Sequence, residues 1–379
     1  CGASQTPTTT EAPKAETKAA TEAAPAAETE QKELTIAGIV FKDEFTMKMV
    51  QQGYEDAARD YGVNIVIGNS MGDLANEQQL VYSYIDMGVD GIAITPYSEE
   101  ASIPILKEAY DKGIEVAVAN IKLNDASFVC GGFTSQDLLN GQKLGDYTAK
   151  YLSDKYGNDL KIAIMDFDAT IPEQSKARYG GFLEKLTANG VNYEIVAQQS
   201  FTDGTKTDFS TQINAIRNSG CDLVFIPIYA AEASVFLTQA KGKLDGMTIF
   251  GCDGLDGLQT KVSDTSMLKG TMMLTPFAVD APDAKTQSFV EKFTKVHGSK
   301  PDQFAADAYD AVYAVKAAME SCGKTPADAD FTTAMVDTMY KITVDGLTGT
   351  MKWDADREPD KAAKAMVFNE DGTTSLFAE

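Results

Sequence analysis

The chain has 379 residues, of which 33 are Lys or Arg and 56 are Asp or Glu, so that its formal net charge at pH 7 is -23. This charge argues against a nucleic-acid partner and against adsorption to an anionic bilayer. His297 is the only histidine, which excludes Ser-His catalysis and multi-histidine metal sites. The sequence contains no run of about eighteen apolar residues that could span a membrane.

The first segment is of low complexity. The chain begins with Cys1-Gly2-Ala3-Ser4, and residues 5–32 are mainly Ala, Thr, Glu, Lys and Pro. Such a composition cannot bury enough apolar surface to offset its ordering entropy, which predicts a flexible tether over residues 1–33. The start resembles a mature bacterial lipoprotein, whose signal peptide is cut directly before a cysteine that then carries the lipid. This resemblance implies a lipid on Cys1 and an extracytoplasmic location at a bacterial cell membrane; the alternative is a truncated chain that happens to begin with a cysteine.

Four further cysteines are Cys130, Cys221, Cys252 and Cys322. They form no C-x-x-C pair, which argues against a zinc site, and we expect neither a metal nor a cofactor. Cys130 and Cys221 lie in or beside predicted strands and are expected to be small buried residues. One disulfide among the four stays open, because the sequence alone does not assign a pairing.

From Leu34 the chain alternates short apolar strands with amphipathic helices. The first series predicts strands over 34–41, 63–67, 90–95, 114–119 and 128–131, with helices over 44–61, 76–86 and 103–110. The second series predicts strands over 160–166, 193–197, 222–227 and 247–250, with helices over 173–189, 209–218 and 230–240. Nearly continuous apolar strands are typical of a parallel sheet that is covered on both faces. Two such series predict an α/β fold with two doubly wound parallel-sheet lobes.

The last third of the chain has a different pattern. Helices are predicted over 283–296, 303–321 and 330–340, followed by strand-like segments at 349–353 and 365–368. This ending indicates that the chain crosses between the lobes more than once, through a multi-crossing hinge. We therefore assign 34–132 plus 276–345 to lobe 1 and 133–275 plus 346–379 to lobe 2. Two joined open lobes create a cleft at the carboxyl ends of their strands, where ligands bind in this architecture.

The first series of elements resembles a known family. The residues that carry the resemblance are Gly88–Pro96 (GVDGIAITP), Ile114–Asn120 (IEVAVAN), Ser135, Gly141–Tyr147 (GQKLGDY) and Ser175–Phe182 (SKARYGGF). They resemble the periplasmic sugar-binding proteins of the ribose and galactose type, over residues 34–195.

The second series is more similar to the branched-chain amino-acid-binding proteins, over residues 200–379. The matching stretches are Thr207–Ser210, Asp222–Tyr229 (DLVFIPIY), Gly251–Gly254, Phe289–Pro301, Ala308–Val312 and Gly346–Gly349. Both families share the type I periplasmic binding-protein fold, so the two resemblances imply one fold and leave the ligand open.

The resemblances imply particular ligand-binding residues. In the sugar family, Asn120 matches a residue that hydrogen-bonds sugar hydroxyls, Arg178 an arginine that reaches ring and hydroxyl oxygens, and Asp253 an acceptor from hydroxyls. In the amino-acid family, Asp253 matches a carboxylate that pairs with the ligand ammonium, and Tyr229 matches a cleft tyrosine. Both families therefore imply that Asp253 binds the ligand. Ser135 is a further candidate.

The first lobe departs from both families. The sugar family usually has Asn and paired aromatic residues after the first strand, where this chain has only Phe41 and Phe45 to supply a stacking face. The carboxylate clamp of the amino-acid family is not recognisable, although Thr95 and Ser98 lie close by in sequence.

Structural roles stay open as alternatives for the candidate residues. They are a surface ion pair for Arg178, a turn cap for Asn120, a turn pair for Asp253-Gly254, and the edge of the core for Tyr229 and Phe41.

These observations favour an extracytoplasmic substrate-binding lipoprotein of an ABC importer. We expect it to capture a small polar solute, preferably a monosaccharide, and to deliver it as a monomer to the permease subunits. The alternatives are the same role for an amino acid, or a ligand-sensing domain. An enzyme is not favoured, because the chain has no Walker-type loop, no G-x-S-x-G elbow and no dinucleotide fingerprint.

Overall fold

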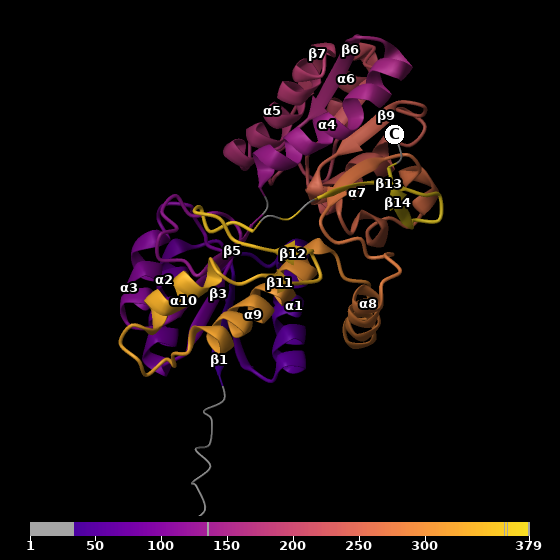
Figure 1. Cartoon of the computed structure of the whole chain (residues 1–379). Coiled ribbons are helices and arrows are strands. Elements are labelled where there is room, and N and C mark those ends of the chain that lie inside the picture. The colour runs from indigo at the N-terminus through magenta and orange to yellow at the C-terminus, as the bar shows by residue number, and fades with distance from the viewer. Residues whose placement is uncertain (1–33, 135, 360, 362, 378–379) are drawn as a thin grey trace, which may run out of the picture. The chain divides into compact units, whose positions relative to one another are not determined.

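The computed structural model describes residues 34–134, 136–359, 361 and 363–377 (Figure 1). Cys1, the tether predicted over 1–33 and the candidate Ser135 lie outside the described residues. The described part contains a five-stranded sheet, a seven-stranded sheet and a two-stranded ribbon.

The first sheet consists of five parallel strands in the order β2-β1-β3-β4-β5. Its elements are β1 (Thr35–Val40), α1 (Phe45–Tyr61), β2 (Asn64–Asn69), α2 (Leu74–Met87), β3 (Gly91–Ile94), α3 (Ile103–Asp111), β4 (Glu115–Asn120) and β5 (Gly131–Thr134). The order reverses at β1, as in doubly wound sheets, so the carboxyl ends of β1 and β3 open a crevice at one edge.

Two helices from the end of the chain cover this sheet. They are α9 (Gln303–Cys322) and α10 (Phe331–Met339). Helix α9 packs on α1, β4 and β5, and Figure 1 shows α9 and α10 in orange beside the indigo and violet strands. Helix α8 (Ala284–His297) contributes Phe289 and Phe293 to the same apolar core.

The second sheet has the order β14-β13-β10-β9-β8-β6-β7. Its strands are β6 (Asp159–Met165), β7 (Asn192–Gln199), β8 (Leu223–Ile226), β9 (Thr248–Gly251), β10 (Met272–Thr275), β13 (Lys364–Phe368) and β14 (Thr374–Leu376), and its helices are α4 (Asp137–Tyr156), α5 (Pro172–Ala188), α6 (Ser210–Ser219) and α7 (Ala230–Ala240). Strands β6 to β10 are parallel, whereas β13 and β14 add an antiparallel edge. The predicted fold class, α/β with two doubly wound lobes, is confirmed.

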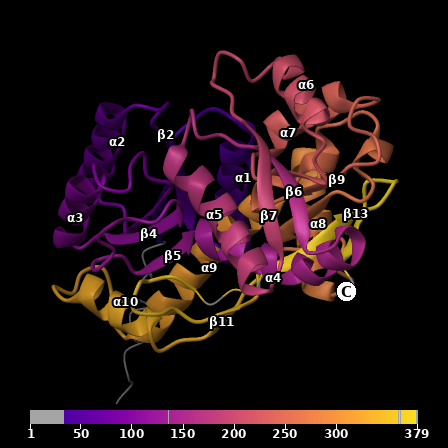
Figure 2. The same cartoon turned by 90° about the horizontal axis from the view of Figure 1, so that it is seen from above.

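Helix α4 is the longest element that the sequence pattern missed. Gly141 and Gly145 lower its helix propensity, yet the structure shows why they stand there. A Cβ at Gly141 would lie 2.1 Å from the Arg178 carbonyl oxygen, and one at Gly145 would lie 2.7 Å from the Phe182 carbonyl oxygen. Figures 1 and 2 both show α4 and α5 side by side. Glycine therefore allows the two backbones to come into contact.

The segment before β13 packs on the first sheet. Strand β11 (Val344–Asp345) pairs with β12 (Thr350–Met351), and Trp353 lies in the first core with its Nε1 donating to the Gly132 carbonyl oxygen at 3.1 Å. This packing differs from the division expected from the sequence, in which lobe 2 resumes at residue 346. An indole needs both an apolar site and an acceptor, and β5 supplies both.

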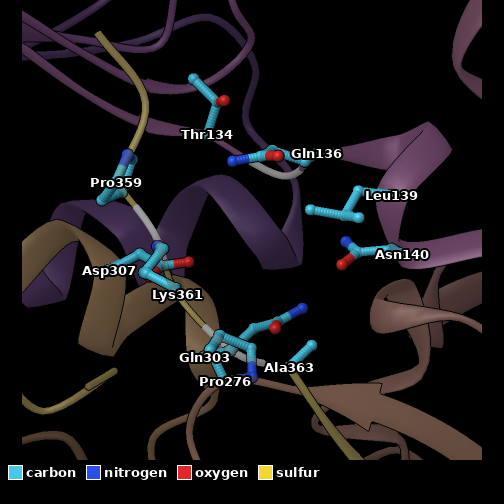
Figure 3. A pocket seen from close by; sticks show the side chains of 10 residues that line it. All are labelled: Thr134, Gln136, Leu139, Asn140, Pro276, Gln303, Asp307, Pro359, Lys361 and Ala363. Atoms are coloured by element: carbon cyan, nitrogen blue, oxygen red, sulfur yellow. The ribbon is translucent and has the colours of Figure 1, made fainter. Parts of the chain in front are cut away.

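The chain passes between the sheets after β5, after β10 and before β13. Residues of all three passages line one small cavity of about 30 Å³: Thr134 and Gln136, then Pro276, then Pro359, Lys361 and Ala363 (Figure 3). Because the three passages meet there, we take this place as the hinge.

Within the described residues, no helix is long and apolar enough to cross a membrane, and no group of three or more His, Cys, Asp or Glu side chains is arranged to hold a metal ion. Cys130, Cys221, Cys252 and Cys322 are all free thiols, and Cys130 and Cys221 are buried as predicted.

The close contact of α4 and α5 predicts opposite effects for two adjacent glycines. A Cβ at Gly181 would lie 2.3 Å from the Leu138 carbonyl oxygen, so Gly181→Ala should lower the free energy of unfolding by about 1–3 kcal/mol. Gly180 on the same helix has no atom within 4 Å of its Cβ position. Gly180→Ala should therefore be neutral or stabilise the helix by up to about 1 kcal/mol. Urea unfolding measures both values, and equal effects would contradict the close contact.

Candidate functional site

A cavity of about 540 Å³ lies between residues of the two sheets, a volume in the range of small-molecule sites. The loop after β4 and Glu99 border it on the side of the first sheet, while the first turns of α4 and α5 border it on the side of the second. The lining residues are Glu99, Asn120, Ile121, Lys122, Leu123, Asn124, Thr134, Gln136, Asp137, Leu138, Leu139, Gln142, Gln174, Asp354, Asp356 and Glu358.

The lining is rich in amides and carboxylates. Five lining residues are Asn or Gln and five are Asp or Glu, against a single lysine. Lys122 Nζ lies 3.4 Å from Asp356 Oδ2, so its charge is already paired. No described lining residue is aromatic. The cavity therefore offers many hydrogen-bond acceptors, amide donors and no stacking face.

Asn120 lies at the end of β4, where the chain turns into the cavity loop. Its φ angle of 62° lies in the left-handed region, which Asn tolerates better than most residues. Its Nδ2 donates to Thr95 Oγ1 at 3.2 Å, and Thr95 is fully buried after β3. Thr95 therefore orients the Asn120 amide, and two predicted site residues are brought together.

The segment before the last hinge passage supplies a further wall. Glu358 is buried beside β5, where its Oε2 accepts from Thr134 Oγ1 at 2.6 Å. The Gly132 amide donates to the Arg357 carbonyl oxygen at 2.7 Å, which fixes the segment along the strand. Burial raises the pKa of Glu358 above its ordinary value. The segment thus places a carboxyl at the cavity wall.

The centre of the second-sheet side is the guanidinium of Arg178, whose side chain is 0% exposed. Its Nε donates to Asp137 Oδ1 at 2.6 Å, its Nη1 to the Pro227 carbonyl oxygen at 3.1 Å, and its Nη2 to the Tyr229 hydroxyl at 3.2 Å. Asp253 Oδ1 lies 3.4 Å from Nη2. We call Asp137, Arg178, Tyr229 and Asp253 the Arg178 cluster.

The cluster is electrostatically unbalanced, because two carboxyl groups face one guanidinium. Burial raises the pKa of Asp137 to about 6, the Arg178 charge acts in the opposite direction, and the Asp253 carboxylate adds to the rise. Burial works against the Arg178 charge, but the neighbouring Asp253, Tyr229 and Asp137 raise its pKa well above the ordinary value. Arg178 therefore stays charged and holds both carboxyls in place.

The Arg178 cluster reaches the cavity through two residues. Asp137 lines the cavity directly, and the Tyr229 hydroxyl donates to Oε1 of Gln174, another lining residue, at 3.0 Å. Arg178 itself does not line the cavity. It was expected to reach the ligand from the second lobe, but Asp137, Pro227 and Tyr229 already engage all three of its nitrogens. In this structure it supports the wall of the cavity.

Asp253 follows β9 and is 1% exposed. Neither of its carboxylate oxygens accepts a hydrogen bond from any described residue. A buried carboxylate without donors is costly, so Asp253 has unused hydrogen-bonding capacity. Asp253 is not among the residues that line the cavity.

Phe41 and Phe45 do not reach the cavity. The ring of Phe45 is covered by the Lys261 ammonium, 3.0 Å from its centroid, and Phe41 packs against the first core. The Lys261 ammonium therefore occupies the face of the Phe45 ring that was expected to stack on a sugar. Neither aromatic residue belongs to the lining that includes Asn120 and Asp137.

A comparison with families of known proteins decides the family. The sequence model described as "Periplasmic binding protein" matches residues 90–373, which is most of the chain. The chain belongs to the periplasmic binding protein family. This membership agrees with the two-lobed fold and with the fold of both families that the sequence resembles.

Among curated relatives of this binding protein, the ABC transporter periplasmic-binding protein YphF of Escherichia coli is 26% identical over 293 residues, covering 74% of this chain and 86% of the relative. The galactofuranose-binding protein YtfQ of the same species is 26% identical over 188 residues, covering 48% and 57%. Among solved structures, the branched-chain amino acid transporter substrate binding protein LivJ of Streptococcus pneumoniae, in complex with isoleucine, has a TM-score of 0.73 at 19% identity, covering 91% of this chain and 99% of LivJ. The relatives are binding proteins, and this chain is a binding protein and not an enzyme.

Asp137 and Gln174 were not singled out from the sequence. Gln174 stands four residues before Arg178 on α5, so the two share one helix face. Asp137 opens the helix that follows β5, at the carboxyl edge of the first sheet, where polar residues of this binding protein face the cleft. Helical spacing from Arg178 could have found Gln174, whereas Asp137 could be found only once α4 was recognised as a helix.

The raised pKa of Asp137 predicts a pH dependence of stability. The Asp137 carboxyl keeps its proton up to about pH 6 in the folded state and only up to about pH 4 in the unfolded chain. The free energy of unfolding should therefore fall by about 1–3 kcal/mol as the pH rises through this window. Asp137→Asn should remove this part of the slope. Asp154→Asn, an exposed residue on the same helix, serves as the control and should keep it. Urea unfolding from pH 4 to 7 measures the slopes, and identical slopes for all three proteins would contradict the assignment.

Proposed function

We propose that this binding protein captures a neutral, hydroxyl-rich solute of monosaccharide size in the 540 Å³ cavity, outside the cytoplasm, and delivers it to the permease of an ABC importer. The observation that carries the proposal is the lining of five carboxamides and five carboxyl groups with one paired lysine. Attachment through a lipid on Cys1 and action as a monomer stay predictions of the sequence.

A polyol suits this lining because each hydroxyl both donates and accepts. Carboxamides such as Asn120 and Gln174 do the same, and carboxylates accept from the remaining hydroxyls. A solute with hydroxyls on several carbons satisfies such a wall without bringing a charge into it. The printed name of the relative YtfQ, a galactofuranose-binding protein, supports the same class of solute.

An anionic solute fits the cavity poorly. Its charge would face Asp137, Asp354, Asp356 and Glu358, and Lys122, the one cation among the described lining residues, is paired with Asp356. Like charges in a partly desolvated site repel strongly and select against such a partner.

A zwitterionic amino acid is the second candidate. The donor-free carboxylate of Asp253 suits an ammonium group, and the structural relative LivJ is bound to isoleucine. The carboxylate of the amino acid would need several donors from the first lobe. Neither Thr95 nor Ser98, the two residues that lie close to this place in the sequence, lines the cavity. This shortage of donors places the amino acid second.

We assign roles to the site residues as follows. Asn120 and Gln174, which line the cavity on opposite sides, hydrogen-bond the solute. Asp253 does not line the cavity in this structure, but its carboxylate accepts no hydrogen bond, which leaves it available to a solute hydroxyl. Arg178 and Tyr229 hold the second-lobe wall. The lobes open at the hinge to admit the solute, and contacts from both sides stabilise the closed form.

Removal of the Asn120 amide should weaken binding. Asn120→Gly removes the side-chain hydrogen bonds and tolerates the left-handed backbone of this position, so we expect about a 10-fold higher Kd for the best sugar or polyol found by a thermal-shift screen. Asn218→Gly, on the exposed face of α6, is the control and should leave Kd unchanged. Isothermal titration calorimetry measures both. A screen in which carboxylic acids raise the Tm and sugars do not would contradict the proposal.

A further inference from the structure

We propose that Gln303 is a positioning residue, which fixes the loop that carries Asp253 to the helix of the opposite lobe and so prepares Asp253 for the solute. The inference rests on the proposed function, since it takes Asp253 as a solute acceptor. Gln303 does not itself belong to the lining of the large cavity.

Gln303 opens α9, the helix that packs on the first sheet, yet its side chain reaches the second sheet. Its Nε2 donates to the main-chain oxygen of Asp253 at 2.8 Å, and the residue is 1% exposed. The helix does not need this amide for its own cap, because Asp302 Oδ1 accepts from the Ala305 amide at 3.1 Å. The Gln303 side chain is therefore free to bond across the lobes.

The main chain of Gln303 makes a second bond to the same loop. Its amide donates to Asp256 Oδ2 at 3.0 Å. Asp256 also accepts from Thr275 Oγ1 at 2.8 Å and from the Gly257 amide at 2.9 Å, so it ties the loop to the end of β10. One residue of α9 thus holds both ends of the turn from Asp253 to Asp256.

The hydrogen bonds of Gln303 to the Asp253 loop lie at the hinge. Gln303 lines the small cavity where the three chain passages meet (Figure 3). One turn further along α9, Asp307 Oδ1 pairs with Lys361 Nζ at 2.6 Å, and Figure 3 shows these two side chains together. Atoms close to a hinge move little when the lobes rotate, so the bond to Asp253 persists in open and closed forms.

The consequence is a preorganised acceptor. A loop held by buried hydrogen bonds loses little freedom when a ligand binds, and the saved ordering cost appears as affinity. The loop is also held by the bonds of Asp256, and it packs closely at Gly254, where a Cβ would lie 2.6 Å from the Ile228 carbonyl oxygen. Loss of the Gln303 amide should therefore loosen the loop without unfolding it.

The test is Gln303→Met in the full chain, which keeps the length of the side chain and removes the donor. We expect Kd for the sugar found in the screen to rise about 3- to 10-fold, as for one buried hydrogen bond. In an Asp253→Asn background the same change should have no further effect, because Gln303 acts through Asp253. Hydrogen exchange of the amides from Asp253 to Gly257 should be faster in Gln303→Met without any ligand.

Two variants serve as checks on this experiment. Gln287→Met removes a comparable amide on α8, whose Nε2 donates to the Ala281 carbonyl oxygen at 2.6 Å, and should change neither affinity nor loop exchange. Gln303→Asn retains the amide, but its side chain is one methylene too short to reach the Asp253 main-chain oxygen. It should show the same rise in Kd as Gln303→Met, and it provides the test if the Met variant folds poorly.

The outcomes separate the two claims. If the wild-type protein binds sugar but Gln303→Met and Gln303→Asn bind with unchanged Kd, or if the loss adds fully to that of Asp253→Asn, the positioning role is overturned and the proposed function stands. If the wild-type protein binds no sugar or polyol, the proposed function falls and this role falls with it.

Discussion

The buried guanidinium of Arg178 is the interaction on which the second-lobe side of the site depends. It is fully desolvated, yet Asp137, Tyr229 and the Pro227 carbonyl oxygen satisfy its nitrogens. A buried cation of this kind is tolerated only with such partners, and removal of one partner leaves an uncompensated charge. The cluster therefore fixes the starts of α4 and α5, and with them the walls that Asp137 and Gln174 contribute to the cavity.

Close backbone packing allows this arrangement. Gly141 and Gly181 bring α4 and α5 into contact, so that Asp137 on one helix meets Arg178 on the other. On the opposite side of the cleft, Thr95 orients Asn120, and at the hinge Gln303 holds the Asp253 loop. Asp137, Asn120 and the Asp253 loop are thus each held by a hydrogen bond to a buried residue of the scaffold. Support of this kind is what keeps a binding site in its productive geometry.

The sequence predicted the two series of strands, because parallel strands buried on both faces are nearly continuous apolar runs. It missed α4 because Gly141 and Gly145 weaken the helical pattern, and their reason is visible only once α5 is in place. The resemblances pointed to Asn120, Arg178 and Asp253, but gave no sign that Arg178 turns toward Asp137, or that Lys261 covers Phe45. Such contacts depend on residues far apart in the chain, and local periodicity does not encode them.

The central claim is that a hydroxyl-rich solute binds between Asn120 and Gln174 while Arg178 remains part of the protein scaffold. A crystal structure of the complex with the sugar that binds most tightly tests it directly. We predict solute hydroxyls within hydrogen-bond distance of Asn120 and Gln174, an additional donor on Asp253, and an intact bond from Arg178 to Asp137. A solute that displaces Asp137 from Arg178, or that binds away from this cavity, would contradict the account.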